Sequence, residues 1–161
     1  MARMYTATFK SIAITAAQDL FEILAPADAI VRIHDWTITQ STETGDAAEE
    51  MLILTTNRGV GSVTSGSGGG TVTPQPVEDG DPAFGGTVER NNTTIMAVGS
   101  GTLETDLEVH SWNVRVPYQK IYTPETRPVI SPSNRWTLEL ETAPADSVTV
   151  HGTITFEEIG G

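Results

Sequence analysis

Three histidines are the residues whose side chains could most readily bind a metal ion or transfer a proton. His34, His110 and His151 each lie in a stretch with the period-two alternation of a β-strand. No two of them stand two or four residues apart, so a local metal-binding pair is missing. A pair of His34 and His151 remains conceivable if their strands are neighbours. The prediction is that all three are hydrogen-bonded strand histidines, with no metal site.

An acidic turn and a glycine-rich segment are the other places where ions or phosphates could bind. Glu78, Asp79 and Asp81 offer the oxygen ligands that calcium prefers, but the EF-hand spacing is not met. The glycines at 66–70 are followed by Thr-Val-Thr-Pro, not by the helix and lysine of a phosphate-binding loop. A solvated turn and a flexible loop are the predictions, and neither a cofactor nor a metal is expected.

Catalysis has no local motif in this sequence. The Gly-x-Ser-x-Gly turn of the hydrolases is absent. Paired carboxylates for glycoside hydrolysis depend on spatial separation, which the sequence leaves open. We therefore predict that the protein is not an enzyme and has no catalytic residues; an enzyme would need histidines and carboxylates gathered in one pocket.

Three tryptophans raise the possibility of a sugar-binding surface. Trp36, Trp112 and Trp136 all fall in predicted strands, and Trp36 and Trp136 share a face with aliphatic neighbours. Core packing is the favoured interpretation. The alternative is a flat platform on which sugar rings stack.

Composition limits the partners and the environment. The chain has 161 residues, a net charge of −12 and no cysteine. Such a charge repels phosphate backbones, and no cluster of Lys and Arg reverses it locally, so nucleic-acid binding is not expected. The apolar run after Lys10 is too short for a secretory signal, and no run reaches the roughly 18–20 residues of a membrane span. We expect no membrane partner and synthesis in a cytoplasm.

Two similar segments carry the clearest strand patterns. Residues 25–40 read APADAIVRIHDWTITQ, and residues 143–156 read APADSVTVHGTITF. Each has an Ala-Pro-Ala-Asp turn followed by period-two alternation, which is typical of a strand with one buried face. The shared face is predicted to hold Ile30, Arg32, His34, Trp36 and Ile38 in the first segment, and Val148, Val150, Gly152, Ile154 and Phe156 in the second. We expect these strands to be neighbours or to hold equivalent positions.

Short alternating segments separated by turns continue along the rest of the chain. They predict an all-β fold, an antiparallel β-sandwich or jelly roll of about 8–10 strands. One domain over residues 1–161 is expected from the length. A helix over Ile12–Leu24 is the alternative for that part, because Ala, Gln, Leu and Glu favour helix. The other predicted strands are Met4–Phe9, Ile12–Thr15, Asp19–Leu24, Glu50–Asn57, Thr87–Thr94, Leu103–Tyr118 and Arg135–Thr142, with an acidic turn at Thr42–Asp46.

Two segments are predicted to lie outside this sandwich. Residues 59–86 hold nine Gly and three Pro and are expected to form a long flexible loop. Tyr122–Asn134 carries Pro124, Pro128 and Pro132 and is expected to be an extended, unpaired connection.

Taken together, several segments resemble small virion proteins of tailed bacteriophages and, more broadly, jelly-roll capsid decoration (cement) proteins. They are the start ATFKSIAITAAQDLFEILAPADAIVRIHD, the Gly-rich insertion, the segment YTPETRPVISPSNRWTLELETAPAD and the terminal FEEIGG. The resemblance covers nearly the whole chain as an overall pattern and includes no catalytic motif. It implies a structural protein on the capsid exterior, made in the host bacterial cytoplasm. It further implies a homotrimer at capsomer junctions that binds the major capsid protein.

Contacts with this partner are assigned to segments whose backbone groups look uncommitted to a core. These are Met1–Lys10, the loop 59–86 and Tyr122–Asn134. The alternative function is a phage tail, fibre or carbohydrate-binding sandwich module. The residues expected to make partner contacts are Met1, Arg3, Tyr5, Lys10, Arg58, Val60, Val63, Val72, Phe84, Tyr122 and Arg127.

Overall fold

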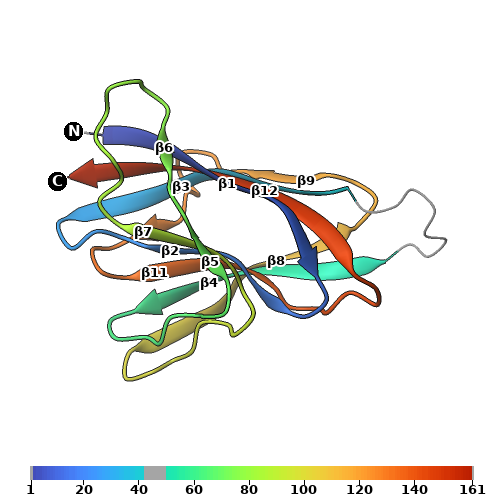
Figure 1. Cartoon of the computed structure of the whole chain (residues 1–161). Coiled ribbons are helices and arrows are strands. Elements are labelled where there is room, and N and C mark those ends of the chain that lie inside the picture. The colour runs from blue at the N-terminus through green and yellow to red at the C-terminus, as the bar shows by residue number, and fades with distance from the viewer. Residues whose placement is uncertain (1, 42–49, 161) are drawn as a thin grey trace.

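The computed structural model describes residues 2–41 and 50–160, which form twelve β-strands and no helix (Figure 1). Met1 and the predicted turn Thr42–Asp46 lie outside the described residues. The strands are β1 (Ala2–Ile14), β2 (Gln18–Leu24), β3 (Ala29–Gln40), β4 (Met51–Val60), β5 (Gly70–Val72), β6 (Gln75–Pro76), β7 (Thr87–Asn92), β8 (Thr102–Asn113), β9 (Tyr118–Ile121), β10 (Val129–Ile130), β11 (Arg135–Leu140) and β12 (Val148–Gly160).

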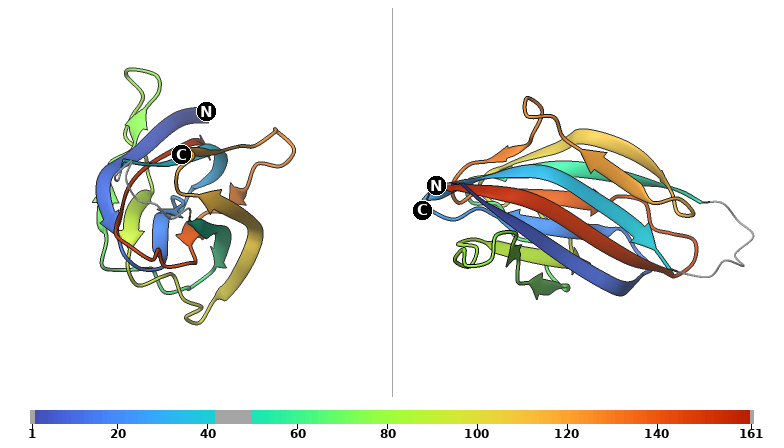
Figure 2. Two further views of the ribbon diagram at one scale, coloured as in Figure 1. Left: turned by 90° about the vertical axis from the view of Figure 1, so that its right-hand side faces the viewer. Right: turned by 90° about the horizontal axis from the view of Figure 1, so that it is seen from above.

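The strands form two antiparallel sheets that face each other (Figures 1 and 2). The first sheet has the order β10-β3-β12-β1-β6, with β9 also paired to β3, and the second has the order β5-β7-β2-β11-β4-β8. The pairing is nested: β1 with β12, β2 with β11, β3 with β9 and β10, and β4 with β8. A long antiparallel hairpin folded across two sheets gives this order, which is a jelly roll. The predicted fold class is confirmed, and the helix alternative over Ile12–Leu24 is wrong.

Large apolar side chains fill the space between the sheets. Trp36, Trp112, Trp136, Phe21 and Phe156 are all at most 1% exposed. Burying a large apolar side chain stabilises the fold by about 1.5–3 kcal/mol. With no cysteine in the chain, packing of this core, together with strand pairing, holds the two sheets together.

The two similar segments are neighbours, as one of the two alternatives predicted. β12 pairs with β3 from Val150 opposite Gln40 to Gly160 opposite Ala29. The predicted inward face of β12 is confirmed. The predicted inward face of β3 is wrong in its first half, because Val31 and Ile33 are buried there instead of Ile30, Arg32 and His34. A β-bulge at His34, between the pairs Asp35–Thr155 and Ile33–Phe156, switches the face.

A second bulge joins two strands that the sequence suggested were separate. β1 runs from Ala2 to Ile14 and takes in both Met4–Phe9 and most of Ile12–Thr15. Its register against β12 shifts between Phe9 and Ile12, where Ser11 has φ of 57°. The backbone of β1 pairs with β12 on one side and with β6 on the other. The N-terminal segment is therefore an interior strand of its sheet.

The glycine-rich segment is joined to the fold by strand pairing over part of its length, and its flexibility stays a prediction. β4 continues to Val60, and β5 and β6 lie within the segment and pair with β7 and β1. We call residues 61–101, between β4 and β8, the insertion. Many of its glycines allow close backbone approach: a Cβ on Gly69 would lie 2.0 Å from the Arg90 carbonyl oxygen, and one on Gly86 would lie 2.2 Å from that of Leu24. These close contacts need glycine for its size.

The proline-rich connection is partly paired as well. β10 pairs with β3 through Val129 opposite Arg32 and Ile130 opposite Val31. The predicted strand Leu103–Tyr118 is two strands in different sheets, β8 and β9, joined by a turn in which the Val116 amide donates to the Asn113 carbonyl. Alternation alone did not reveal this turn, because turn residues can continue the period of a strand by chance.

Candidate functional site

One side of the sandwich brings together the edges of the two sheets. β8 is the last strand of the second sheet, and β9 and β10 flank β3 at the border of the first. We call the surface formed by β8, β9, β10, the turn at 114–117 and residues 51–53 of β4 the β8–β9 side. Glu108 on β8 accepts hydrogen bonds from Tyr122 Oη at 2.5 Å and Lys120 Nζ at 3.2 Å. These contacts connect the two sheets at their open edge.

Tyr122 is the buried centre of this connection. Its Oη accepts a hydrogen bond from Trp36 Nε1 at 3.2 Å while donating to Glu108. Burial raises the pKa of Tyr122 far above its usual value, and the Glu108 carboxylate raises it further. The phenol therefore keeps its proton over the physiological range and acts as a fixed donor.

His110 belongs to the same group of contacts. Its Nδ1 lies 2.8 Å from Tyr118 Oη, and Trp36 stacks on the Tyr118 ring with centroids 5.4 Å apart. Its Nε2 is buried without a hydrogen-bond partner and lies 3.6 Å from Glu108 Oε2. The two cavities described below include no histidine. In this arrangement the imidazole packs between aromatic rings and β8.

Exposed apolar side chains are frequent on the elements of the β8–β9 side, where they point outward from both sheets. Glu108 of β8 faces Lys120 of β9, so the alternate residues of these strands are turned towards solvent. Of the eleven large apolar side chains exposed in the described residues, seven lie there. Val109 is 60% exposed and Ile121 is 67% exposed. Along its outer edge β8 also has no strand partner among the described residues. An unpaired edge beside apolar side chains is typical of a protein-binding surface. The seven are Met51, Ile53, Leu107, Val109, Val116, Ile121 and Val129.

The residues predicted to contact a partner are scattered over the fold. Lys10 is exposed, and Val60 is 36% exposed at the end of β4. Arg3 pairs with the buried Glu158 at 3.3 Å, and Arg58 pairs with Glu104 at 2.6 Å. The half-buried remainder are Val63, Arg127 and, packed against the core, Val72 and Phe84.

Two of the predicted contact residues are corrected by their burial. Tyr5 is 0% exposed, with its Oη donating to the Pro82 carbonyl at 2.9 Å, and Tyr122 is 3% exposed. The premise was that their segments have an uncommitted backbone, and both backbones are in fact paired: Tyr5 lies in β1, and the Tyr122 amide donates to the His34 carbonyl. Their side chains are inaccessible to a partner in this fold.

The three histidines occupy separate places. His34 Nε2 lies 3.3 Å from Glu157 Oε2, whereas His151 Nε2 lies 2.8 Å from Ser41 Oγ. Although β3 and β12 are neighbours, His151 stands opposite Thr39, not opposite His34. Within residues 2–41 and 50–160 no three His, Asp or Glu side chains are grouped so as to hold a metal ion. In the acidic turn, Glu78 and Asp79 are exposed and the Asp81 amide donates to the Glu78 carbonyl at 3.2 Å.

The tryptophans are core residues, and the alternative of a sugar-stacking platform is wrong. Trp36, Trp112 and Trp136 are at most 1% exposed, so none offers a flat face to a ligand. Trp112 Nε1 donates to the Val116 carbonyl at 2.9 Å. The predicted packing against aliphatic neighbours is confirmed.

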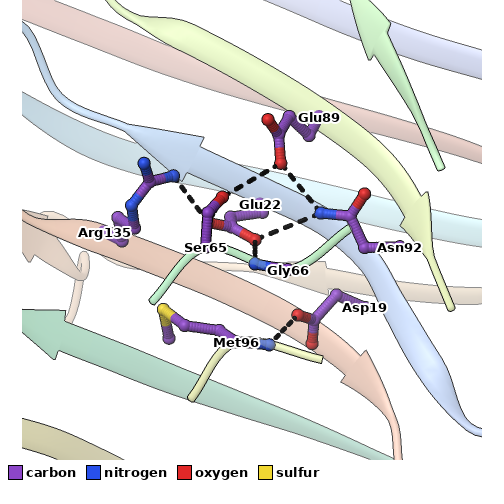
Figure 3. Close-up of polar contacts among 8 residues, drawn as sticks. All are labelled: Asp19, Glu22, Ser65, Gly66, Glu89, Asn92, Met96 and Arg135. Atoms are coloured by element: carbon purple, nitrogen blue, oxygen red, sulfur yellow. Dashed lines mark hydrogen bonds and ion pairs between the residues drawn. The ribbon is translucent and has the colours of Figure 1, made fainter. Parts of the chain in front are cut away.

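A layer of buried polar groups lies between the second sheet and the insertion, and the sequence did not indicate it (Figure 3). Glu22 on β2 is 1% exposed and accepts hydrogen bonds from Arg135 at 2.6 Å, Ser65 Oγ at 2.8 Å and the Gly66 amide at 2.9 Å. Asp19, also on β2, is 1% exposed and accepts from the Met96 amide at 2.7 Å. The available signal was the pair of carboxylates inside DLFEIL, a strand that is buried on both faces.

Two cavities border this polar layer. One, of about 240 Å³, is lined by ten residues with four carboxylates among them. The other, of about 190 Å³, lies at the glycines 66–70 and includes Glu89. The Glu89 carboxylate in its lining repels a phosphate. The larger cavity is lined by Asp19, Thr55, Asn57, Ile95, Met96, Leu103, Thr105, Asp106, Glu139 and Glu141.

Comparison with known proteins gives no family. No protein-family model and no curated protein matches this chain. Among solved structures, it is similar to chains from the Gx strain of infectious bursal disease virus, from the T13 particle of that virus and from its T=1 particles. Each match has 16% identity and covers 99% of this chain, with TM-scores of 0.21, 0.16 and 0.18. The chain spans about two fifths of their length (42%, 40% and 41%). Overlap this weak carries no argument, so the β-sandwich assignment stands on the strand pairing itself. No helix among the described residues is long and apolar enough to span a membrane.

Proposed function

We propose that this protein is a non-enzymatic structural component of a virus particle, a decoration protein that binds the outer surface of a tailed-phage head. The observation that carries the proposal is the β8–β9 side, a rigid jelly-roll edge with seven exposed apolar side chains and no strand partner among the described residues. The jelly roll is an architecture that viral capsid domains share with lectins and cupins. Among these classes, the sequence resemblance to virion decoration proteins favours a viral capsid role.

Rigidity of this surface supports a docking role. Glu108, Tyr122 and Lys120 tie β8 to the other sheet, so the exposed side chains of β8 and β9 are held in fixed relative positions. Association on a preformed surface avoids the ordering cost that a flexible segment would carry. The major capsid protein is the proposed partner, and its binding surface should be apolar with a neutral or basic rim, because this chain has a net charge of −12.

Oligomeric state is the second part of the proposal. Three copies at a capsomer junction would match the local symmetry of the shell, and each copy would present one β8–β9 side to the lattice. Light scattering of the purified protein measures this directly. A mass near three times 17.2 kDa is expected, and a monomer at all concentrations would contradict the trimer.

Co-sedimentation with capsids of the parent virus that lack this chain tests the docking. The wild-type protein should pellet with the capsids, and Val109→Lys or Ile121→Asp should reduce the bound fraction at least tenfold. Both side chains are exposed by 60% or more, so neither change should unfold the protein. Val77→Lys is the matched control, because Val77 is 62% exposed but lies in the insertion.

The possible results of this experiment test separately where the contact lies and whether the protein binds capsids at all. Loss of binding for Val77→Lys alone would move the contact to the insertion, where the glycine-rich segment was predicted to bind. Wild-type protein that never pellets with capsids would contradict the decoration role. Electron cryo-microscopy of the particle then distinguishes head from tail, because density on the tail alone would support the alternative of a tail or fibre module.

A further inference from the structure

A short ribbon of the insertion lies over the buried polar layer. Residues 64–67 and 94–97 pair with each other through bridges between Thr64 and Ala97 and between Ser67 and Thr94. Two carboxylates of β2 hold this ribbon by its backbone: Glu22 accepts from the Gly66 amide, and Asp19 accepts from the Met96 amide (Figure 3). We call residues 94–97 the latch segment.

Within residues 2–41 and 50–160 the Asp19 carboxyl has one hydrogen bond and no cationic partner. Its Oδ2 accepts from the Met96 amide at 2.7 Å, while its Oδ1 is buried without a partner. The side chain is 1% exposed, so bulk solvent does little to stabilise a charge on it. A carboxylate in such a place is costly unless it carries a proton.

The charged groups that the described part of the chain places beside Asp19 are acidic or already paired. Glu139 stands directly opposite on β11, Glu22 lies on β2 itself, and Glu89 lies on β7. Arg135 is 2.6 Å from Glu22 and is bound there. The cavity beside Asp19 adds Asp106 and Glu141, and no Lys, Arg or His is among its ten lining residues. The neighbours therefore oppose a negative charge on Asp19.

Burial first, and then the neighbouring carboxylates Glu139, Glu22 and Glu89, raise the pKa of Asp19 to about 8, against the lowering effect of the Met96 hydrogen bond. In any state where the latch segment lifts and water reaches Asp19, its pKa returns towards the ordinary value of about 4. The closed and open states thus differ in their affinity for one proton.

We propose that the insertion is closed by a proton-held latch, in which neutral Asp19 keeps the latch segment on the second sheet and rising pH opens it. The proton lies on a carboxyl that has a buried, unpartnered oxygen beside an acid-lined cavity. Opening exposes this carboxyl to water, so each opened molecule releases the proton. The inference concerns the insertion alone and does not depend on capsid binding.

Linkage sets the direction and the range of the effect. The closed state holds more protons than the open state between the two pKa values, so the opening constant rises with pH by up to about tenfold per unit from roughly pH 5 to 7. Above about pH 8, Asp19 is ionised in both states and the opening constant becomes constant. Below about pH 4, both states are neutral and the latch is at its tightest.

Amide hydrogen exchange of the full-length protein measures this opening at single residues. The reporters are the amides of Met96 and Ala97, followed from pH 5 to 9 and corrected for the intrinsic pH dependence of exchange. In the wild type, their opening constant should rise about a hundredfold between pH 5 and 7 and level off near pH 8. In Asp19→Asn, which cannot ionise, it should stay within about threefold over the same range.

Asp106→Asn is the matched control, because Asp106 is an exposed carboxylate that lines the same cavity. This variant should keep the wild-type pH dependence. Amides of Ile154 and Phe156 in β12 report on unfolding of the whole protein and should not follow the latch segment. A pH-independent wild type, an unchanged slope in Asp19→Asn, or β12 amides that open together with Met96 would each overturn the proposal.

Discussion

Two carboxyl groups on β2, three residues apart, are both buried, but they differ in the partners that surround them. Glu22 and Asp19 are each 1% exposed, and each holds a backbone amide of the insertion. Glu22 has Arg135 at 2.6 Å and further donors in Ser65 and Asn92. Asp19 has the Met96 amide as its one hydrogen-bond donor in the described part of the chain. The difference teaches that a buried acid is stabilised as an anion where a cation and several donors meet it, and as a neutral acid where they do not.

Removing the charge of Glu22 should have the largest effect. Glu22→Gln leaves Arg135 without its anion and weakens the bonds to the insertion. Breaking a buried ion pair on one side typically costs about 3–5 kcal/mol, and the free energy of unfolding should fall by this order. Urea unfolding measures it. Glu89→Gln is the control, because the half-buried Glu89 also accepts from Ser65 and Asn92 but has no ion pair. Equal losses in both variants would contradict the special role of Arg135.

Removing the charge of Asp19 should have the opposite sign. Asp19→Asn keeps an oxygen for the Met96 amide and cannot become an anion. Because the pKa of Asp19 is raised in the folded state, the wild type loses stability as pH rises from about 4 to 8, and the variant does not. At pH 8 the variant should be more stable by on the order of 2–4 kcal/mol. Urea unfolding at pH 4 and pH 8 gives the difference, which should vanish at pH 4. A less stable variant at pH 8 would show that Asp19 is a stabilising anion.

Glu139 allows a further test of the contrast between Glu22 and Asp19, because it is an acidic neighbour of Asp19. Its own pKa is raised, mainly by burial, and it accepts from Asn57 Nδ2 at 2.7 Å. Glu139→Gln removes one source of repulsion while keeping an oxygen for Asn57. The pKa of Asp19 should therefore fall below about 8, as followed by its carboxyl chemical shift in a nuclear magnetic resonance titration. An unchanged pKa would assign the whole effect to burial.

An exposed ion pair gives the smallest expected effect. Arg58 Nη2 lies 2.6 Å from Glu104 Oε2, and the two side chains are 36% and 38% exposed. Surface pairs of this kind contribute about 0–1 kcal/mol because water and salt screen them. Arg58→Ala should therefore change the midpoint of thermal unfolding by only a few degrees. If Arg58→Ala lowered the stability as much as Glu22→Gln does, burial would not explain why the ion pair of Glu22 is the stronger one.

Much of the fold could be predicted because a strand with one buried face carries its own pattern. Trp136, Leu138 and Leu140 alternate with polar positions in β11, and the inward face of β12 does the same. Period-two alternation gave the wrong face where a β-bulge inserts an extra residue into a strand. The register of β2 against β11 shifts between Phe21 and Asp19, so a bulge at Leu20 places Asp19 and Glu22 on one face. Strict alternation puts residues three apart on opposite faces, which is why the polar layer was missed.

The amino-acid sequence by itself determined the all-β character, the strand pattern of the two similar segments and the burial of the three tryptophans, because side-chain periodicity and apolar content are local properties. Only the tertiary structure decided that the glycine-rich segment pairs with β7 and β1, and that Asp19 has no cation beside it within the described residues. The Asp19 carboxyl meets the Met96 amide across 77 residues of chain, and Glu22 meets Arg135 across 113. Charges at such separations become neighbours only through strand register, and register depends on bulges and turns that no short stretch of sequence specifies.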